Sequence, residues 1–285
     1  MSTTGTKSGA IGLVLARPPR LLGTEPFFME FIAGIEQHLA DWDLSLLLHV
    51  VSTQDAELAA YRRWAEHGLV EAAVVVNRLV HDERPAVLAA AGLPALLVGE
   101  PAPGFPAVRT DNTGPIGEAV GELRQLGHRR IARITGPGAL LHTTERSAAF
   151  VAACEKAGAT ARLVEGDYSE EAGAKLTTRL LTGGEPPTAI IYDNDVMALA
   201  GLAAARELGI DVPGELSVVA WDDSTLCRLA SPALTAMSVD VHQFGVLVAE
   251  SVLELLDGGP VTERWSPIAH YVPRASTGPV PAPRA

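Results

Sequence analysis

The sequence has few of the features that mark several large classes of protein. It contains two cysteines, Cys154 and Cys227, and neither lies in a spacing typical of a metal site or a disulfide framework. Aromatic residues make up only 5% of the chain. No apolar run approaches the ~20 residues that a membrane-spanning helix needs, and residues 1–9 lack the apolar region of a secretory signal. We therefore expect a soluble, cytoplasmic protein with no membrane contact.

Basic charge and catalytic motifs are also scarce. The formal net charge is -12, so the chain itself has no basic footprint for nucleic acid. No GxSxG, GxxxxGK[ST] or HExxH motif is present, no GxGxxG follows the first expected strand, and no two histidines are spaced i, i+4. The triplet 193–195 (Asp-Asn-Asp) resembles the DxD metal site of nucleotide-sugar transferases, but no nucleotide-binding feature accompanies it. We expect no enzyme, no cofactor and no metal.

What the chain does contain is a regular alternation of short apolar runs and amphipathic segments. We expect strands at residues 10–16, 44–51, 72–76, 93–98, 107–110, 130–135, 162–165, 188–192, 216–221 and 234–239. We expect helices at 27–41, 54–67, 84–91, 113–126, 143–157, 170–182, 196–208 and 243–256. Alternation at this spacing predicts parallel, doubly wound α/β sheets, and two rounds of it predict two lobes.

Two polar tips follow neighbouring strands in the second round. Asn194 comes just after the strand at 188–192, and Asp222 follows the strand at 216–221. Ligand crevices form at the carboxyl ends of such strands. Asp222 could instead cap a turn, and Asn194 could cap the next helix, a role that does not exclude ligand binding. We interpret the adjacent Asp195 and Asp223 as structural caps.

Further residues suit the binding of a hydroxylated ligand. Arg146 begins a helix among small residues, where it is either a surface charge or a fork of donors facing a crevice. Tyr168 lies in a loop with little core to fill, and Phe27 and Phe28 open a helix just beyond the first strand. Aromatic faces together with Asp, Asn and Arg side chains are the usual means of holding a sugar.

An ordered set of segments resembles the effector-binding core of the LacI family of bacterial transcription regulators, which shares its fold with type I periplasmic sugar-binding proteins. The resemblance covers about residues 9–278. Its segments lie at 9–14 (GAIGLV), 111–112 (DN), 126–131 (LGHRRI), 136–137 (GP), 146–150 (RSAAF), 187–190 (PTAI), 194–198 (NDVMA), 212–223 (from VP to VVAWDD), 232–235 (PALT) and 274–277 (RAST).

The resemblance implies a set of effector-binding residues. Arg146 matches the arginine that binds effector hydroxyls or carboxylates, Asn194 and Asp222 match the two polar strand tips, and Tyr168 falls where an aromatic often stacks on the ligand. The full set is Arg146, Asn194, Asp222, Tyr168, Phe28, Phe27 and Arg78, the last in a segment with Asp82 that looks like a variant of sugar-responsive members. The chain departs from the family pattern at Ala149, at Ala220 and at Gly99-Glu100, which leaves the ligand's identity open.

The same resemblance implies two doubly wound, parallel-sheet lobes joined by three crossover strands. We place the crossings near 109–113, 237–241 and 257–262. The N-terminal lobe is expected to contain residues 10–110 plus 241–257, the C-terminal lobe residues 111–238 plus 260–274, and the flexible tails residues 1–9 and 275–285.

The implied function is a sensor in which a small-molecule effector, a mono- or oligosaccharide, biases lobe closure and so controls DNA binding allosterically. The expected state is a homodimer. Operator DNA would be a partner only through a helix-turn-helix headpiece upstream of Met1, which this sequence lacks. Two other classes stay open: a sugar-binding protein of a transport system, which needs a signal or lipid anchor, and an enzyme on the same fold, which needs a catalytic set.

Overall fold

The computed structural model describes residues 9–18 and 26–280. The chain forms two compact units and crosses between them three times: after Thr110, after Val239 and after Pro267. The first unit combines the N-terminal part of the chain with Asp240–Pro267, and the second combines Asp111–Val239 with the segment from Ile268 onward. Each unit is therefore assembled from segments that are far apart in the sequence.

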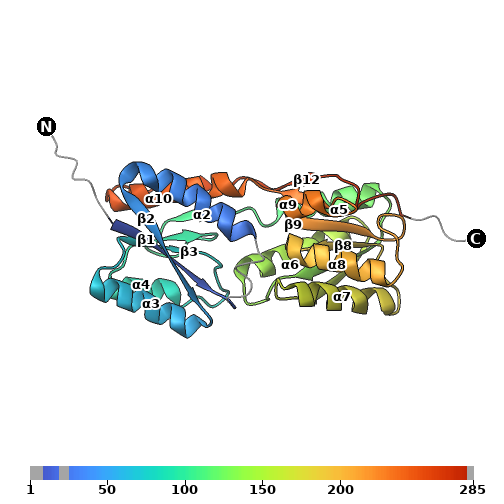
Figure 1. Cartoon of the computed structure of the whole chain (residues 1–285), viewed down its shortest axis with the longest axis horizontal. Helices are drawn as coiled ribbons and strands as arrows, with labels where there is room; N and C mark the ends of the chain where they lie inside the picture. The colour runs from blue at the N-terminus through green and yellow to red at the C-terminus, as the bar shows by residue number, and fades with distance from the viewer. Residues whose placement is uncertain (1–8, 19–25, 281–285) are drawn as a thin grey trace, which may run out of the picture. The chain divides into compact units, whose positions relative to one another are not determined.

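The first unit is a sheet with helices on both faces (Figure 1). In the described residues its sheet has six strands in the order β11-β5-β4-β3-β1-β2, all pairing parallel. Its elements are β1 (Gly9–Ala16), α2 (Pro26–Leu39), η1 (Ala40–Trp42), β2 (Leu44–Val51), α3 (Gln54–His67), β3 (Ala72–Val75), α4 (Arg84–Ala91), β4 (Ala95–Val98), β5 (Ala107–Arg109), α10 (Val241–Leu256) and β11 (Arg264–Trp265).

The second unit repeats this arrangement. Among the described residues its sheet has the order β12-β10-β9-β8-β6-β7, and only the β10–β12 pair is antiparallel. Its elements are α5 (Gly114–Gln125), β6 (Arg130–Thr135), α6 (Leu141–Lys156), β7 (Thr160–Glu165), α7 (Glu170–Thr182), β8 (Ala189–Tyr192), α8 (Asp195–Glu207), β9 (Ser217–Asp222), α9 (Thr225–Leu229), β10 (Thr235–Ser238) and β12 (His270–Val272).

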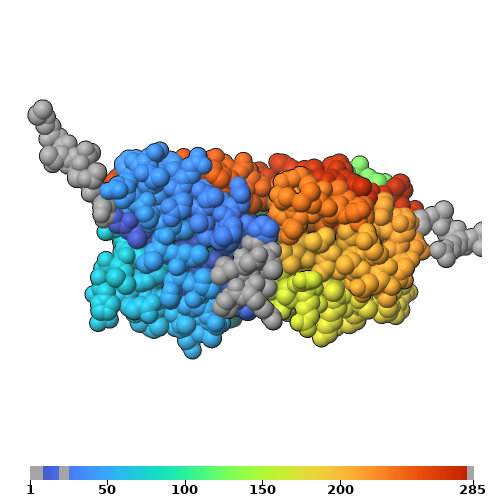
Figure 2. All heavy atoms as spheres, in the orientation of Figure 1, coloured from blue at the N-terminus to red at the C-terminus, as the bar shows by residue number. Residues whose placement is uncertain are grey.

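Each sheet is buried because helices cover both of its faces. In the second unit, α7 and α8 pack on one face over Ile190 and Val218, and α5 and α6 pack on the other over Ile191 and Val219. Helices α7 and α8 also form much of that unit's surface in Figure 2. Strand β8 is buried along its whole length. This explains why its sequence is a continuous apolar run and not an alternating one.

Side-chain caps begin several of the helices. The side chains of Thr53, Ser169, Asn194 and Asp240 accept hydrogen bonds from backbone N–H groups in the first turns of α3, α7, α8 and α10. These N–H groups have no partner within their own helix. The caps therefore determine where each helix starts, and all four lie in the loop that follows a strand.

The predicted fold class, two doubly wound parallel α/β lobes, is confirmed. The third crossing, predicted at 257–262, is wrong, because the chain leaves the first unit only after Pro267. Residues 264–265 form β11, which pairs with β5 and so keeps this segment in the first unit. Helix α9 was not predicted, since its five residues are too short to show a period.

The prediction that residues 275–280 belong to a flexible tail is also wrong. Ser276 is fully buried. Its hydroxyl accepts a hydrogen bond from Thr235 N at 2.8 Å and donates one to Val218 O at 2.6 Å. The Gly278 carbonyl accepts from the ring of His128. These bonds satisfy polar groups of β9, β10 and the turn before β6, so the segment is fixed on the second unit. Residues 281–285 and 1–8 lie outside the described residues.

Helices α2 and α10 approach each other closely through two glycines. A Cβ atom on Gly34 would lie 2.0 Å from His242 O, and one on Gly245 would lie 2.2 Å from Phe31 O. The ring of Phe31 meets that of Phe244 edge-on beside this contact, with ring centres 5.3 Å apart. Any side chain larger than hydrogen at these positions must push the two backbones apart.

We predict that Gly34→Ala destabilises the chain by about 1–3 kcal/mol or more, as expected for overpacking against backbone atoms. Urea unfolding followed by circular dichroism would measure the loss. Gly117→Ala is the matched control, because Gly117 lies inside helix α5 with open space where its Cβ would be. That variant should gain about 0.5–1 kcal/mol. Equal effects of the two substitutions would contradict the close approach.

Candidate functional site

The second unit brings several polar side chains to one edge of its sheet. Strands β8 and β9 are parallel neighbours, so Asn194 and Asp222 follow or end them on the same side. Helix α6, which carries Arg146, begins after β6 on that side as well. Tyr168 lies in the loop between β7 and α7. Four of the seven predicted residues therefore belong to one edge of one unit.

Arg146 is oriented by an aromatic ring and an amide. Its guanidinium carbon lies 4.2 Å from the centre of the Trp221 ring. Its Nε donates a hydrogen bond to Asn112 Oδ1 at 3.0 Å, and Asn112 Nδ2 in turn donates to Glu145 Oε2 at 2.8 Å. A cation held over an indole is attracted by the ring's negative face. These contacts fix the direction in which the remaining N–H groups of Arg146 point.

Asn194 makes two structural hydrogen bonds, and the sequence predicts only one of them. Its Oδ1 caps α8 by accepting from Met197 N at 2.9 Å, and its Nδ2 donates to the Tyr168 carbonyl at 3.1 Å. The side chain is almost fully buried. The cap predicted for this position is present, and Asn194 also holds the loop of Tyr168 in place. An effector contact by Asn194 stays a prediction.

Asp222 and its neighbours form a concentration of negative charge. Burial, the negative charges of Asp195 and Asp193, and only partial compensation by Arg146 raise the pKa of Asp222 to about 8. Burial also raises the pKa of Asp195. Asp222 has a left-handed backbone with φ of 82°. Within the described second unit no group donates a hydrogen bond to its carboxylate. Such a carboxyl is able to act as a donor or an acceptor near neutral pH.

Tyr168 and Asp223 each make a polar contact within the second unit. Tyr168 is half-buried with φ of 69°, and its hydroxyl lies 2.9 Å from His142 Nε2. Asp223 accepts from Arg274 Nη2 at 2.8 Å, so it forms an ion pair and does not cap a helix. The Tyr168 ring lies against Gly136, in the loop between β6 and α6. A stacking role for this ring stays a prediction.

The other three predicted residues belong to the first unit. Phe28 is buried, with the guanidinium of Arg17 over its ring at 4.6 Å, and Phe27 is half-buried and stacked on Phe31. Arg78 is buried as well. Phe28 therefore contributes to the core, and only Phe27 of this pair keeps a partly exposed face.

Arg78 is held in a buried ion-pair cluster. It donates to Asp82 Oδ2 at 2.6 Å and to the Glu100 carbonyl. Asp82 Oδ1 also accepts a hydrogen bond from Arg84 Nε, and Arg84 Nη1 donates to Glu57 Oε1 on α3 at 3.1 Å. Burial acts to raise the pKa of Asp82, but the bonds from Arg84 and Arg78 outweigh it and lower this pKa to about 2. The cluster fixes the loop after β3, and an effector contact by Arg78 stays a prediction.

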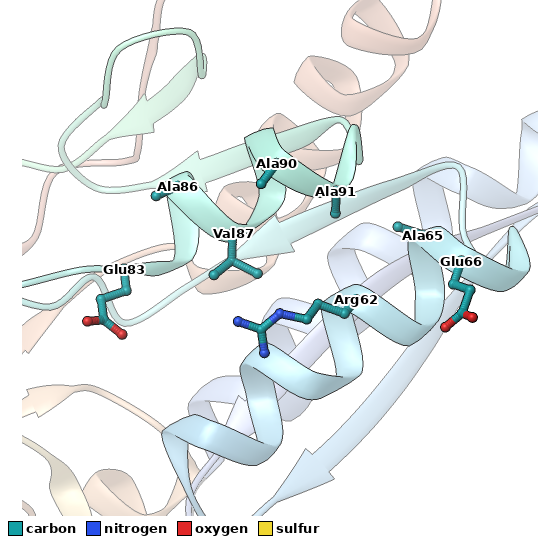
Figure 3. A pocket seen from close by; sticks show the side chains of 8 residues that line it. All are labelled: Arg62, Ala65, Glu66, Glu83, Ala86, Val87, Ala90 and Ala91. Carbon is teal, nitrogen blue, oxygen red and sulfur yellow. The ribbon is translucent and has the colours of Figure 1, made fainter.

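A separate groove of about 690 Å³ lies in the first unit between α3 and α4. Val87 of α4 and Arg62 of α3 point toward one another across it (Figure 3). The remaining lining is Ala65, Glu66, Glu83, Ala86, Ala90 and Ala91. None of the predicted site residues lines this groove. Its small side chains carry few convergent polar groups, unlike those at the edge of the second sheet.

The described ranges 9–18 and 26–280 contain neither a helix that could span a membrane nor a cluster of metal-ligating side chains. None of their helices has the length and apolar character required to cross a membrane. In the same ranges, no three His, Cys, Asp or Glu side chains are grouped in a way that would hold a metal ion.

Four residues at this edge were not singled out from the sequence. Asn112 and Trp221 orient Arg146, His142 contacts Tyr168, and Arg133 binds Asp193. Arg133 was the most visible signal, because it is a charged residue between the apolar residues Ala132 and Ile134 of a strand. The partners of the others lie far along the chain and only the fold brings them together.

Comparisons with known proteins agree on one family. The profile of the Periplasmic binding protein-like domain matches residues 120–277. The HTH-type transcriptional regulator AglR of Rhizobium meliloti is 31% identical over 290 residues, which cover 96% of this chain and 80% of AglR. The HTH-type transcriptional repressor CytR of Escherichia coli is 29% identical, with coverages of 82% and 69%.

Solved structures give the same result. A LacI family transcriptional regulator from Bifidobacterium animalis subsp. lactis superposes with a TM-score of 0.87 at 35% identity, covering 95% of this chain and 98% of that one. A complex of the transcriptional regulator CelR with cellobiose superposes with a TM-score of 0.84 at 26% identity, covering 94% and 84%.

We predict a pH-dependent contribution of Asp222 to stability. An acid with a raised pKa binds more protons in the folded chain than in the unfolded chain, where the pKa of Asp is about 4. Its favourable contribution is therefore complete below about pH 4 and is lost as the pH rises toward 8. Asp222→Asn should gain melting temperature relative to the parent as the pH rises from 5 to 8.

Differential scanning calorimetry at several pH values would measure this. Glu207→Gln, at an exposed position on α8, is the control for removing a carboxylate. A difference between Asp222→Asn and the parent that stays constant from pH 5 to pH 8 would contradict the raised pKa.

Proposed function

Because the chain belongs to the LacI family of transcriptional regulators and forms that family's ligand-sensing domain, we propose that the second-unit edge around Arg146 binds a sugar effector. One observation carries this proposal. The guanidinium of Arg146 is held over the ring of Trp221, and Asp222 follows Trp221 on strand β9. A fork of donors, an acceptor and an aromatic face are the groups that a sugar ring requires.

Each group has a distinct role in this proposal. Arg146 donates hydrogen bonds to effector hydroxyl oxygens from α6, and Asp222 binds effector hydroxyls from the end of β9. Asn194 uses one N–H on the Tyr168 carbonyl among the described residues, which leaves the second N–H of its amide for the effector. Tyr168 stacks on the apolar C–H face. Phe27 and Arg78 of the first unit are proposed as further contacts, with Phe28 supporting them from the core.

The effector class is supported by one solved relative, CelR, whose complex contains cellobiose. For this chain we propose a mono- or oligosaccharide. The relatives are transcriptional regulators and not enzymes, and the proposed mechanism needs binding alone, without catalysis or a cofactor.

Regulation follows if the effector favours one arrangement of the two units over another. Because binding shifts an equilibrium only by its differential affinity for two states, the effector must bind the closed arrangement more tightly. We propose that this closure changes the affinity of a helix-turn-helix headpiece for operator DNA, in the cytoplasm. The chain's own net charge of -12 does not favour phosphate contacts.

A thermal-shift screen of mono- and disaccharides, with cellobiose included, tests the binding proposal. A sugar at a hundredfold excess over its Kd should stabilise the parent chain by about 2.7 kcal/mol. Arg146→Met should weaken binding by about tenfold to a hundredfold, because it removes charge-assisted hydrogen bonds. Arg179→Met, at an exposed position on α7, is the matched control and should bind like the parent. Equal binding by both variants would place the site elsewhere.

We also propose that the chain forms a homodimer through its first unit. Strand β2 is an edge of the described sheet, and Leu47 on it and Trp42 just before it are 38% and 52% exposed. Exposed apolar residues on an unpaired edge strand favour association with another surface.

Light scattering should therefore give twice the 29.9 kDa mass of one chain. Leu47→Glu should shift the equilibrium toward monomer, and Leu163→Glu, on the edge strand β7 of the second unit, should not. A monomeric parent chain at high micromolar concentration would overturn this proposal.

A further inference from the structure

A buried ion pair lies directly beneath the proposed effector site. Arg133 is at the middle of β6 and Asp193 immediately follows β8, and both side chains are fully buried. Arg133 donates two parallel hydrogen bonds to Asp193, from Nε to Oδ1 and from Nη2 to Oδ2, each at 2.7 Å. This is the bidentate geometry in which arginine binds a carboxylate most strongly.

The pair is connected to the segments that carry the site. Arg133 Nη1 donates to Ser147 Oγ at 3.0 Å, and Ser147 is next to Arg146 in the first turns of α6. Asp193 directly precedes Asn194, and its Oδ2 also accepts from Gly136 N at 3.0 Å. One ion pair therefore ties β6, β8, the loop at 136 and the start of α6 together.

The fold alone gives no reason for this pair. Removing two charges from water is costly, and apolar residues of similar volume are often as stabilising or more so. Both neighbours of Arg133 in the strand, Ala132 and Ile134, are ordinary core residues. Buried polar groups that are fully bonded do, however, give directional precision that apolar packing lacks. Arg133 and Asp193 lie beside the proposed effector contacts, whose side chains must be held in fixed directions.

We propose that Arg133 and Asp193 are the positioning residues of the effector site. Their hydrogen bonds set the rotation of α6, which aims Arg146, and the entry to α8, which aims Asn194. The pair touches neither the effector nor solvent. The inference rests on the proposed function in one respect only, that Arg146 and Asn194 are the residues that contact the sugar.

The electrostatics of the site support this assignment. Burial lowers the pKa of Arg133, Asp193 raises it, and the positive charge of Arg146 lowers it further. The charge of Asp193 in turn acts on Asp222. The charges of the pair thus interact with both ends of the proposed site, so its removal should change the site and not only its support.

The test replaces the pair without leaving a buried charge. Arg133→Met fills the volume of the arginine, and Asp193→Asn keeps an acceptor for Gly136 N. The double variant is compared with the parent and with Arg264→Met/Glu254→Gln, which removes an ion pair of the first unit. Circular dichroism melting verifies folding.

The deciding measurement needs no sugar. Hydrogen exchange of the Arg146 Nε–H, which bonds Asn112, is followed by ¹H–¹⁵N NMR and assigned through the missing signal of Arg146→Met. We expect exchange at least tenfold faster in the double variant and unchanged exchange in the control. Unchanged exchange in a folded double variant would overturn the proposal. If the double variant does not fold, Arg133→Lys replaces it, since lysine keeps the charge but cannot bond Asp193 twice and Ser147 as well.

A second measurement separates this inference from the proposed function. Calorimetric titration with cellobiose, or with the sugar that stabilises the parent in the screen, should show at least tenfold weaker binding to the double variant. If no sugar binds the parent, the proposed effector class fails, while the exchange measurement still decides whether the pair positions Arg146. Faster exchange with unchanged sugar affinity would overturn the positioning role.

Discussion

Parallel strand pairing is the constraint on which both units depend. Two parallel strands cannot be joined by a tight turn, so the chain must return through a helix to the edge where it started. Every strand in this pattern then ends at the same edge of its sheet. In the second unit, the residues that follow β6, β8 and β9 are gathered there without any contact between them having to form first. The proposed site is thus a consequence of connectivity, to which particular side chains add chemistry.

Those side chains serve the fold and the site together. Asn194 caps α8 through its Oδ1 and anchors the loop of Tyr168 through its Nδ2. Asp222 lies in a left-handed conformation, and burial together with the charges of Asp195 and Asp193 raises its pKa to about 8. Strained backbone and like charges are unfavourable for folding. Their concentration at one edge of one sheet, where Arg146 is also oriented, is typical of a binding surface.

The sequence predicts most of the architecture because burial on both faces leaves a plain signal. Strands such as β3 and β8 are short, continuous apolar runs, and the glycines at 68 and 92 end the helices before the next run. The third crossing was misplaced because the turn at 257–259 resembles the end of a unit. The two-residue strand β11, which keeps the chain in the first unit, has no pattern of its own.

The residues of the proposed site could be picked out from the sequence only where a polar residue comes just after a strand, and their contact with an effector stays a prediction. Asn194 and Asp222 could be located in this way, and Arg146 by resemblance. The contacts that orient them could not, because each joins residues that are distant in the chain. Asn112, in the segment before α5, accepts a hydrogen bond from Arg146. Arg133 on β6 donates to Asp193, which follows the neighbouring strand β8. The segment at 275–280 has no apolar run of its own, and its pattern likewise showed no sign that Ser276 would be buried among strands.

The glycine contact between α2 and α10 has a consequence for the synthesis of the protein. These helices come from near opposite ends of the chain, yet they cover the same face of the first sheet. While the ribosome is still making the second unit, one apolar face of α2 has no partner, because α10 does not yet exist. The unit that is started first therefore cannot be completed until most of the second unit has been made. Until Leu256 has emerged, its exposed face depends on chaperones or on the speed of translation to avoid aggregation.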